Sequence, residues 1–164
     1  MRNGLKVIGG SSCPILTDDI CQILRREHYL TADTDVMLSS FSDGENRVQI
    51  KENIRGYDIF VVQSLCSPVN ENLMELMFIL DALKRSNVNS VTVVLPYYGY
   101  ARQDRKSEPR VPISAKVVSD MLQMMNINRV ITVDLHAGQI QGFYDIPVDN
   151  LYASKVLIEP MANE

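Results

Sequence analysis

The chain has 164 residues, of which 46% are apolar, and it carries a formal net charge of -4. This length is that of one domain, either alone or within a longer protein, and the apolar content is sufficient for a sizeable core. The negative charge gives no support for binding to nucleic acid or to a membrane surface, since both partners select a basic surplus. No apolar run approaches the length of about 18 residues that indicates a membrane-spanning helix.

The cysteines favour a reducing compartment. Cys13, Cys21 and Cys66 are odd in number and lack Cys-x-x-Cys spacing, so a disulfide framework and a zinc site are both disfavoured. Free thiols together with eight methionines are typical of the cytosol, and no signal-like segment follows the first residues. We therefore expect a soluble cytoplasmic protein.

The chain opens with a predicted strand over 5–8, a Gly-Ser turn over 9–12 and a helix over 14–27. The apolar positions on one face of that helix are Ile15, Ile20, Ile23 and Leu24. The turn could surround a phosphate, but it matches neither G-x-G-x-x-G nor a Walker loop, so an ordinary strand-to-helix turn is favoured. His28 is expected at the surface, at the polar end of the helix.

Residues 36–38 and 48–50 predict the arms of a hairpin, with Asp43-Gly44 as its turn. Its tip carries Phe41 and the carboxylates of Asp43 and Glu45. An exposed Phe41 ring could stack on a base while a carboxylate accepts a hydrogen bond from an exocyclic amine. The alternative, which the spacing alone favours, is a hairpin tip with one buried phenylalanine.

The remaining elements alternate between buried strands and amphipathic helices. Strands are predicted over 58–63, 91–95 and 129–133, and helices over 70–85, 112–125 and 150–164. The apolar stripes are Leu73, Leu76, Met77, Leu80 and Leu83 on the first of these helices, and Val117, Val118, Met121, Leu122 and Met125 on the second. This order predicts an α/β fold with an open, mainly parallel sheet and helices on both faces.

A strongly basic loop follows the strand over 91–95. The range 102–110 holds four of the sixteen basic residues of the chain. The ligands of open α/β sheets bind outside the carboxyl ends of the strands, and Arg102 offers a bidentate donor suited to phosphate. Gln103 and Asp104 beside it add hydrogen-bonding capacity. A solvated charged turn is the alternative, but these residue types favour a local anion site.

Three tyrosines, Tyr97, Tyr98 and Tyr100, lie at the same strand exit. An aromatic ring there could face a base or cover the end of the sheet, and we expect at least two of the three to cover the sheet.

Asp134 and His136 follow the next buried strand. On an extended segment their side chains would point to the same face, where they could hold a divalent cation or a metal-bound phosphate. A structural Asp-x-His pair is the more common alternative. The expected position beside the basic loop favours the first interpretation, because cations and a magnesium ligand recur in phosphoryl transfer. The residues alone thus predict a domain that binds a nucleotide polyphosphate or another phosphorylated small molecule.

Six segments together resemble the amino-terminal half of ribose-phosphate diphosphokinases, also called phosphoribosyl pyrophosphate synthetases. They are FSDGE (41–45), IRGYDIFVVQS (54–64), NENLMELMFILDALKR (70–85), PYYGYARQDRK (96–106), PISAK (112–116) and DLHAGQIQGFYDIPVDNLYA (134–153). The resemblance implies a fold like that of type I phosphoribosyltransferases. It also implies transfer of the diphosphoryl group of ATP to the C1 hydroxyl of ribose 5-phosphate, with Mg²⁺, to give phosphoribosyl pyrophosphate and AMP.

The resemblance further implies roles for individual residues. Arg102 and His136 would be catalytic, with Arg102 on the phosphates of ATP and His136 at the magnesium. The ATP-binding residues would be Phe41, Asp43, Glu45, Arg102, Gln103 and Asp104. The first three of these would cross a subunit boundary to hold the adenine in a neighbouring chain. An allosteric phosphate or nucleotide site would contain Arg55, Arg110, Gln141 and Asp149.

The domain organisation implied is an ATP-binding domain over 1–152 and the start of a linking helix over 153–164. That helix would lead to a second domain, absent from this chain, with the ribose 5-phosphate loop. Members of the family assemble as dimer-based homo-oligomers, and we expect a hexamer for the full-length protein. The alternative is a non-catalytic regulatory or structural subunit of such synthetases. Intact ARQDRK, DLHAGQIQGF and FSDGE segments favour the enzyme.

Overall fold

The computed structural model describes residues 4–27, 29 and 34–161, so His28 lies outside the described residues. The elements in chain order are β1 (Leu5–Gly9), α1 (Pro14–Arg26), β2 (Val36–Ser40), β3 (Asn46–Ile50), β4 (Asp58–Val62), α2 (Val69–Arg85), β5 (Ser90–Leu95), α3 (Ser114–Met124), β6 (Arg129–Val133), the 3₁₀ helix η1 (Gly138–Phe143), β7 (Val148–Leu151) and α4 (Ser154–Met161). None of the helices within the described ranges combines the length and apolar character that spanning a membrane requires.

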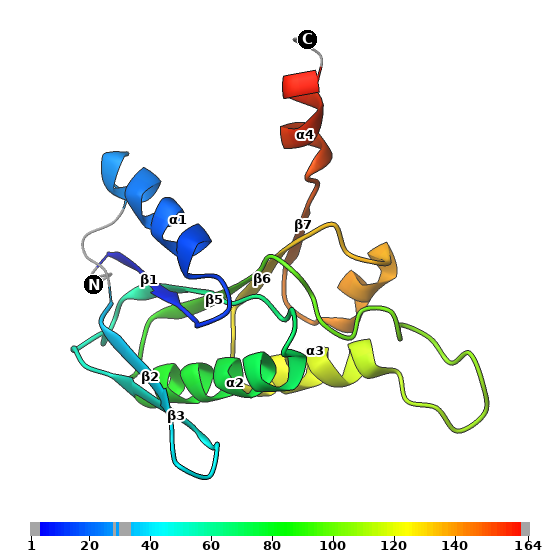
Figure 1. The fold of residues 1–164 in the computed structure, drawn as a ribbon, viewed down its shortest axis with the longest axis horizontal. Helices are drawn as coiled ribbons and strands as arrows, with labels where there is room; N and C mark the ends of the chain where they lie inside the picture. The colour runs from blue at the N-terminus through cyan, green and yellow to red at the C-terminus, as the bar shows by residue number, and fades with distance from the viewer. Residues whose placement is uncertain (1–3, 28, 30–33, 162–164) are drawn as a thin grey trace.

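The main sheet has five parallel strands in the order β1-β4-β5-β6-β7. The antiparallel pair β2–β3 forms a separate hairpin that protrudes from the body of the protein (Figure 1). The predicted parallel sheet with a protruding hairpin is therefore confirmed. Because all five strands run the same way, every loop that follows a strand leaves from the same edge of the sheet.

Alternate residues of the strands face opposite layers of helices, as the period of two in a strand requires. Val7 and Val62 pack against the α1 side together with Cys21. Ile8 and Ile59 pack into the larger core that α2 and α3 cover. Figure 1 shows α1 on one side of the sheet and both α2 and α3 on the other. The prediction of helices on both faces is confirmed.

The apolar faces predicted for α1, α2 and α3 agree with the observed buried residues to different degrees. The predicted stripe of α2 is buried throughout. On α3, Val118 and Leu122 are buried but Val117 is exposed. On α1, Ile20 and Leu24 pack beside Cys21, whereas Ile15 is 79% exposed and Ile23 is half-exposed. The predicted faces of α1 and α3 were thus too wide, since only part of each is buried in the core.

The carboxyl-terminal region differs from the helix predicted over 150–164. Residues 148–151 form β7, which pairs in parallel with β6, and α4 begins only at Ser154. The sequence VDNL contains little that favours a strand, since Asp and Asn are depleted in strands. Pairing with β6 makes it extended. Helix α4 stands away from the sheet (Figure 1), and Val156, Leu157 and Ile158 are exposed.

The Gly-Ser turn after β1 is built into a buried polar network. The Ser11 amide donates to Glu75 Oε1 at 2.8 Å, and the Ser12 hydroxyl donates to Gln63 Oε1 at 2.6 Å. Gln63, which is fully buried, also donates through Nε2 to Glu75 Oε1 at 2.9 Å. These bonds use the turn to join β1 to α2, so the ordinary strand-to-helix turn is the interpretation that holds.

Candidate functional site

The exits of β5 and β6 meet at the carboxyl edge of the sheet. β5 ends at Leu95 and β6 at Val133, and the two strands are neighbours. A small hollow of about 190 Å³ lies between the two segments that leave them. Its lining includes Tyr97, Tyr98, Arg102, Asp134 and His136. The predicted proximity of the basic loop to the Asp134–His136 segment is therefore correct.

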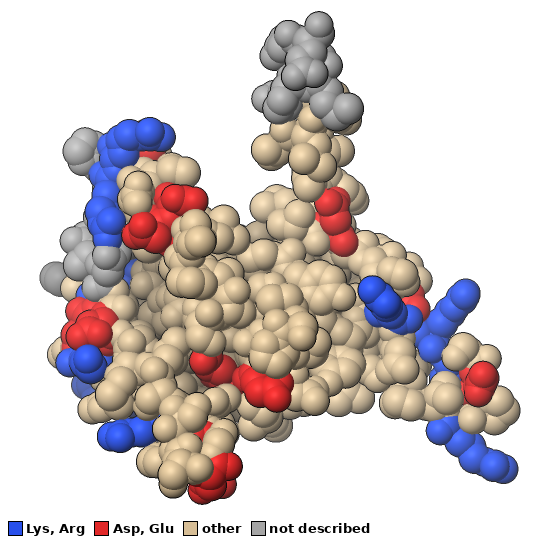
Figure 2. Space-filling model, viewed as in Figure 1, with Lys and Arg blue, Asp and Glu red and all other residues tan. Residues whose placement is uncertain are grey.

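A larger cavity of about 450 Å³ opens beside this hollow and shares Arg102 and His136 with it. Its lining includes Arg102, Gln103, Asp104, Arg105, His136 and Gln139. Figure 2 shows basic side chains gathered over the loop that follows β5. Two guanidinium groups and one carboxylate face a cavity of this size, so the arrangement suits a multiply charged anion.

Hydrogen bonds from two other segments hold the start of the basic loop. The Ala115 amide donates to the Gln103 carbonyl at 3.1 Å, and the Ser114 hydroxyl donates to Gln103 Oε1. From η1, Gln139 Nε2 donates to Asp104 Oδ2 at 2.7 Å. Sequence reasoning missed Gln139 as a functional residue, although its position within DLHAGQIQGF was the available signal. These contacts hold the backbone of Gln103 and the side chain of Asp104.

The geometry of Asp134 and His136 differs from the extended segment predicted. Asp134 has a φ of 45°, in the left-handed region, because the chain turns sharply where β6 ends. Its exposed carboxylate accepts a long bond of 3.4 Å from the Ala153 amide. Both side chains still line the same small hollow. The prediction that Asp134 and His136 lie together is therefore correct, but the reason given for it, the alternation of side chains along an extended strand, is wrong.

These donors fit Mg²⁺ only in part. Among the described residues, no group of three or more His, Cys, Asp or Glu side chains could hold a metal ion. Mg²⁺ commonly keeps several waters and binds through one or two protein groups together with substrate phosphates. Asp134 and His136, next to the Arg102 cavity, match that second mode.

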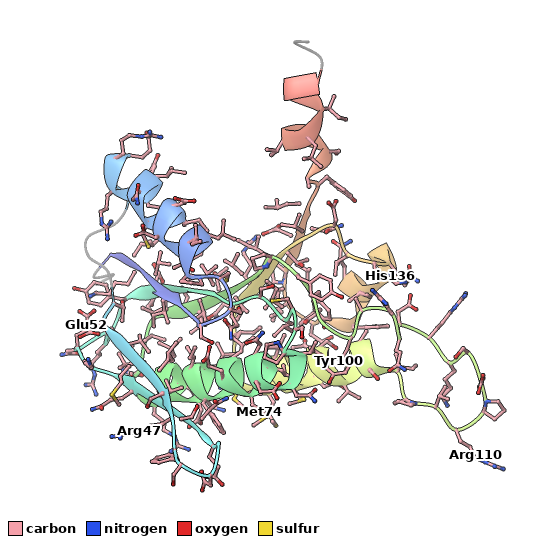
Figure 3. All side chains as sticks on the ribbon, in the orientation of Figure 1. Arg47, Glu52, Met74, Tyr100, Arg110 and His136 are labelled. Carbon is pink, nitrogen blue, oxygen red and sulfur yellow. The ribbon has the colours of Figure 1, made fainter. Side chains whose placement is uncertain are left out.

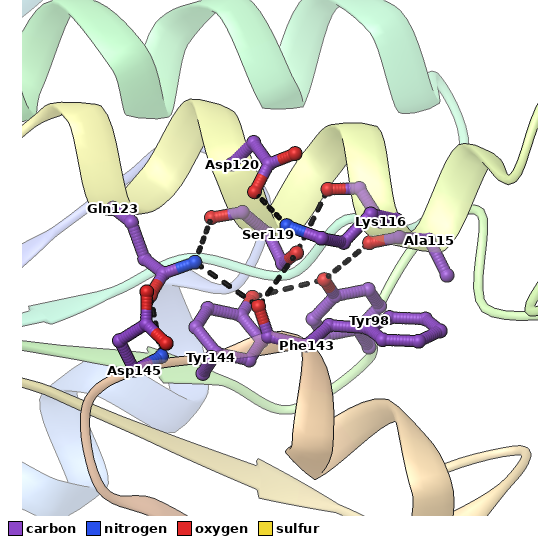
Figure 4. Close-up of polar contacts among 9 residues, drawn as sticks. All are labelled: Tyr98, Ala115, Lys116, Ser119, Asp120, Gln123, Phe143, Tyr144 and Asp145. Carbon is purple, nitrogen blue, oxygen red and sulfur yellow. Dashed lines mark hydrogen bonds and ion pairs between the residues drawn. The ribbon is translucent and has the colours of Figure 1, made fainter.

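Beneath the hollow, Tyr98 and Tyr144 form a buried pair (Figure 4). Their hydroxyl oxygens are 2.9 Å apart, and Tyr98 also donates to the Ala115 carbonyl at 3.2 Å. Tyr98 is 3% exposed, whereas Tyr97 and Tyr100 are 47% and 38% exposed. One tyrosine rather than at least two covers the sheet end, since Tyr97 and Tyr100 are both exposed and Tyr100 has a φ of 64°.

The tyrosine pair should make stability depend on alkaline pH. Burial raises the pKa of Tyr98 from its ordinary 10.0 to about 12, and burial beside Tyr98 also raises the pKa of Tyr144. Above pH 10 the unfolded chain loses these protons first, so the free energy of unfolding should fall as the pH rises from 10 toward 12. Urea denaturation across this range should show a shallower fall for a Tyr98→Phe, Tyr144→Phe double variant. An identical slope would contradict the prediction.

The hairpin tip is open to solvent, and its residues lie outside both hollows that contain Arg102. Phe41 is 51% exposed, so the alternative of a buried phenylalanine is wrong, and the Arg47 guanidinium lies 5.8 Å from its ring centre. Asp43 Oδ1 accepts from the Glu45 amide at 3.1 Å, and Gly44 has a φ of 91°. Figure 1 shows the tip below β2 and β3 and the loop after β5 beyond α3. One chain therefore does not bring Phe41, Asp43 and Glu45 to Arg102.

The four residues of the expected allosteric site lie on four separate segments. Arg55 is exposed in the segment before β4, and Arg110 lies at the outer end of the basic loop (Figure 3). Gln141 in η1 donates to the Gly138 carbonyl at 3.1 Å. Asp149 in β7 pairs with Arg129 at 2.5 Å. Their shared role stays a prediction.

Comparison with known proteins identifies a family for most of the chain. Residues 5–125 match the family described as the N-terminal domain of ribose phosphate pyrophosphokinase. The chain belongs to this family. The ribose-phosphate pyrophosphokinase of Helicobacter pylori is 53% identical over 153 residues, which are 93% of this chain and 46% of that protein. That of Campylobacter jejuni is 61% identical over 123 residues, 75% of this chain and 40% of the relative.

A solved structure of the family has the same fold. The crystal structure of phosphoribosylpyrophosphate synthetase from Mycobacterium smegmatis superimposes with a TM-score of 0.92 at 40% identity. The match covers 99% of this chain and 53% of that one. The chain thus spans about half the length of the ribose-phosphate pyrophosphokinases it matches.

Proposed function

We propose that this domain of the ribose-phosphate pyrophosphokinase family binds Mg-ATP and supplies the ATP half of the reaction that makes phosphoribosyl pyrophosphate. The observation that carries the proposal is that Arg102 and His136, from two neighbouring strand exits, line the same two hollows. The names of the relatives support it, since a pyrophosphokinase transfers a diphosphoryl group. The proposed acceptor is the C1 hydroxyl of ribose 5-phosphate, and AMP leaves.

In the proposed mechanism, Arg102 donates two parallel hydrogen bonds to phosphate oxygens and offsets their negative charge. His136 and Asp134, which line the small hollow next to Arg102, would hold the Mg²⁺ that accompanies ATP. Mg²⁺, when bound with ATP, neutralises phosphate charge. Gln103 and Asp104 orient the nucleotide, with the Gln103 backbone held by α3 and the Asp104 carboxylate held by Gln139. Phosphoryl transfer relies mainly on positioning and charge stabilisation, and these residue types provide both.

The ribose 5-phosphate site and the rest of the reaction need residues outside this domain, in line with the coverage of its relatives. We assign 1–152 to the ATP-binding domain and 153–164 to the start of a linking helix, which the exposed Val156 and Leu157 on α4 support. The active form is a dimer-based homo-oligomer in which Phe41, Asp43 and Glu45 hold the adenine of a neighbour. Its compartment is the cytoplasm, where its three free cysteines stay reduced.

Calorimetric titration with ATP in the presence of Mg²⁺ tests this function. We expect saturable binding that inorganic tripolyphosphate competes with and that chelation of Mg²⁺ weakens. An absence of binding would overturn the proposal. In that case, co-assembly with an active synthetase and a reduced turnover of the mixture would identify a regulatory or structural subunit instead.

A further inference from the structure

We propose that the buried hydroxyl pair of Tyr98 and Tyr144 is a positioning device for the polyphosphate site. Through α3, the pair sets where the Arg102 loop lies relative to the segment that carries His136. Neither tyrosine is assigned a contact with the ligand. The effect of this pair on the affinity for polyphosphate rests on the function proposed above. Its effect on the local structure around Ala115 does not.

The hydrogen-bond chain has a defined direction. Tyr98 has a single hydroxyl proton, which it donates to the Ala115 carbonyl at 3.2 Å. The bond of 2.9 Å between the two hydroxyls is therefore donated by Tyr144 to Tyr98. The rings meet edge-on, with centroids 6.5 Å apart and an interplanar angle of 88°. Three segments are joined in this way: the end of η1, the exit of β5 and the first turn of α3.

Ala115 is the point at which this chain reaches the basic loop. Its carbonyl accepts from Tyr98, and its amide donates to the carbonyl of Gln103, the residue after Arg102. Tyr98 also lines the small hollow next to Arg102 and His136. A shift of the Tyr98 hydroxyl would therefore be felt at the backbone of Gln103 and at the wall of the hollow.

The other end of the chain is held by the same helix (Figure 4). Gln123 Nε2 donates to the Phe143 carbonyl at 3.1 Å, and the Asp145 amide donates to Gln123 Oε1 at 2.6 Å. These bonds fix the residues on either side of Tyr144. Gln139, earlier in η1, connects this segment directly to the basic loop by its bond to Asp104. Helix α3 is thus the common support of both segments that form the site.

Removal of single hydroxyl groups separates positioning from stability. We would compare Tyr144→Phe, Tyr98→Phe and the double variant with Ile59→Val, which deletes one methyl group from the core in β4. The readouts are the Tm, the Kd for inorganic tripolyphosphate with Mg²⁺, and amide exchange at Ala115 by NMR. All Kd values are taken at a temperature at which circular dichroism shows every variant to be folded.

We expect Tyr144→Phe to raise the Kd by about 2- to 30-fold and to accelerate exchange at Ala115. The Tm of the double variant should recover relative to Tyr98→Phe, because no buried hydroxyl is left without an acceptor. Its Kd should stay high, since the link from η1 to α3 is still broken. Ile59→Val should lower the Tm and leave the Kd unchanged.

A Kd that follows the Tm across all four variants would overturn the inference and leave the pair a structural role only. If the wild-type protein binds no tripolyphosphate, the proposed function fails, and amide exchange still decides the positioning. Unchanged protection of Ala115 in Tyr144→Phe would then refute the link, and faster exchange would support it.

Discussion

Replacing Arg102 by alanine should weaken the binding of Mg-ATP by about 1.5–3 kcal/mol, roughly a 10- to 150-fold rise in Kd. Arg102 lines both hollows at the strand exits, so its loss removes a charge-assisted bond at the centre of the site. The side chain is exposed, and the fold should therefore be unaffected. Isothermal titration at fixed Mg²⁺ concentration gives the Kd values of the wild-type protein and of Arg102→Ala. The Kd of Arg102→Lys should fall between them, because lysine keeps the charge but lacks the paired donors of the guanidinium group.

Lys106→Ala is the matched control for this change. Lys106 lies four residues further along the same loop and carries the same charge, but it lies outside the lining of both hollows. Its removal should cost less than about 1 kcal/mol of binding free energy, since water and salt screen the interactions of an exposed charge. Equal losses in the two variants would mean that the loop attracts ATP by its net charge and that Arg102 makes no specific contact.

Gly10→Ala should lower the free energy of unfolding by at least about 2 kcal/mol. A Cβ at residue 10 would lie 2.1 Å from Gln63 Oε1, the acceptor for Ser12. Gln63 cannot move aside at little cost, because it is fully buried and its Nε2 donates to Glu75. The φ of Gly10 lies outside the left-handed region, so what the position requires is space. Urea denaturation followed by circular dichroism measures the change.

Gly142→Ala provides the comparison. A Cβ at Gly142, in η1, would meet no heavy atom within 4 Å, so the change in unfolding free energy should stay within about 0.5 kcal/mol. If Gly10→Ala proved equally mild, the polar network around Gln63 would have to be loose enough to admit a methyl group. The tight contact at Gly10 would then contribute little to the stability of the turn.

The elements that the sequence located correctly are those whose signal is local. The stripe of α2 repeats over about three turns, and β5 is a continuous β-branched run, so each specifies its own conformation. β7 has no such signal, because it becomes a strand only through its pairing with β6. The exposure of Val117 likewise depends on which line of α3 meets the sheet.

Part of the candidate site could likewise be predicted from the sequence, and part could not. The exits of consecutive parallel strands fall on one edge of a sheet, which is why Arg102 and His136 could be placed together from sequence. The turn at Asp134 and the bond from Gln139 to Asp104 depend on contacts between segments far apart in the chain. The same is true of the Tyr98–Tyr144 pair, in which 46 residues separate the partners. Periodicity carries no information about such contacts.

The separation between the hairpin tip and the basic loop has a consequence for how ATP would bind in solution. If Phe41 holds the adenine and Arg102 holds the phosphates, one nucleotide is bound by two chains. Binding is then linked to association by mass action, so the apparent affinity for ATP rises with protein concentration and dilution weakens it. Saturating ATP would in turn draw protomers together. The nucleotide would act as both a substrate and a cross-link between subunits.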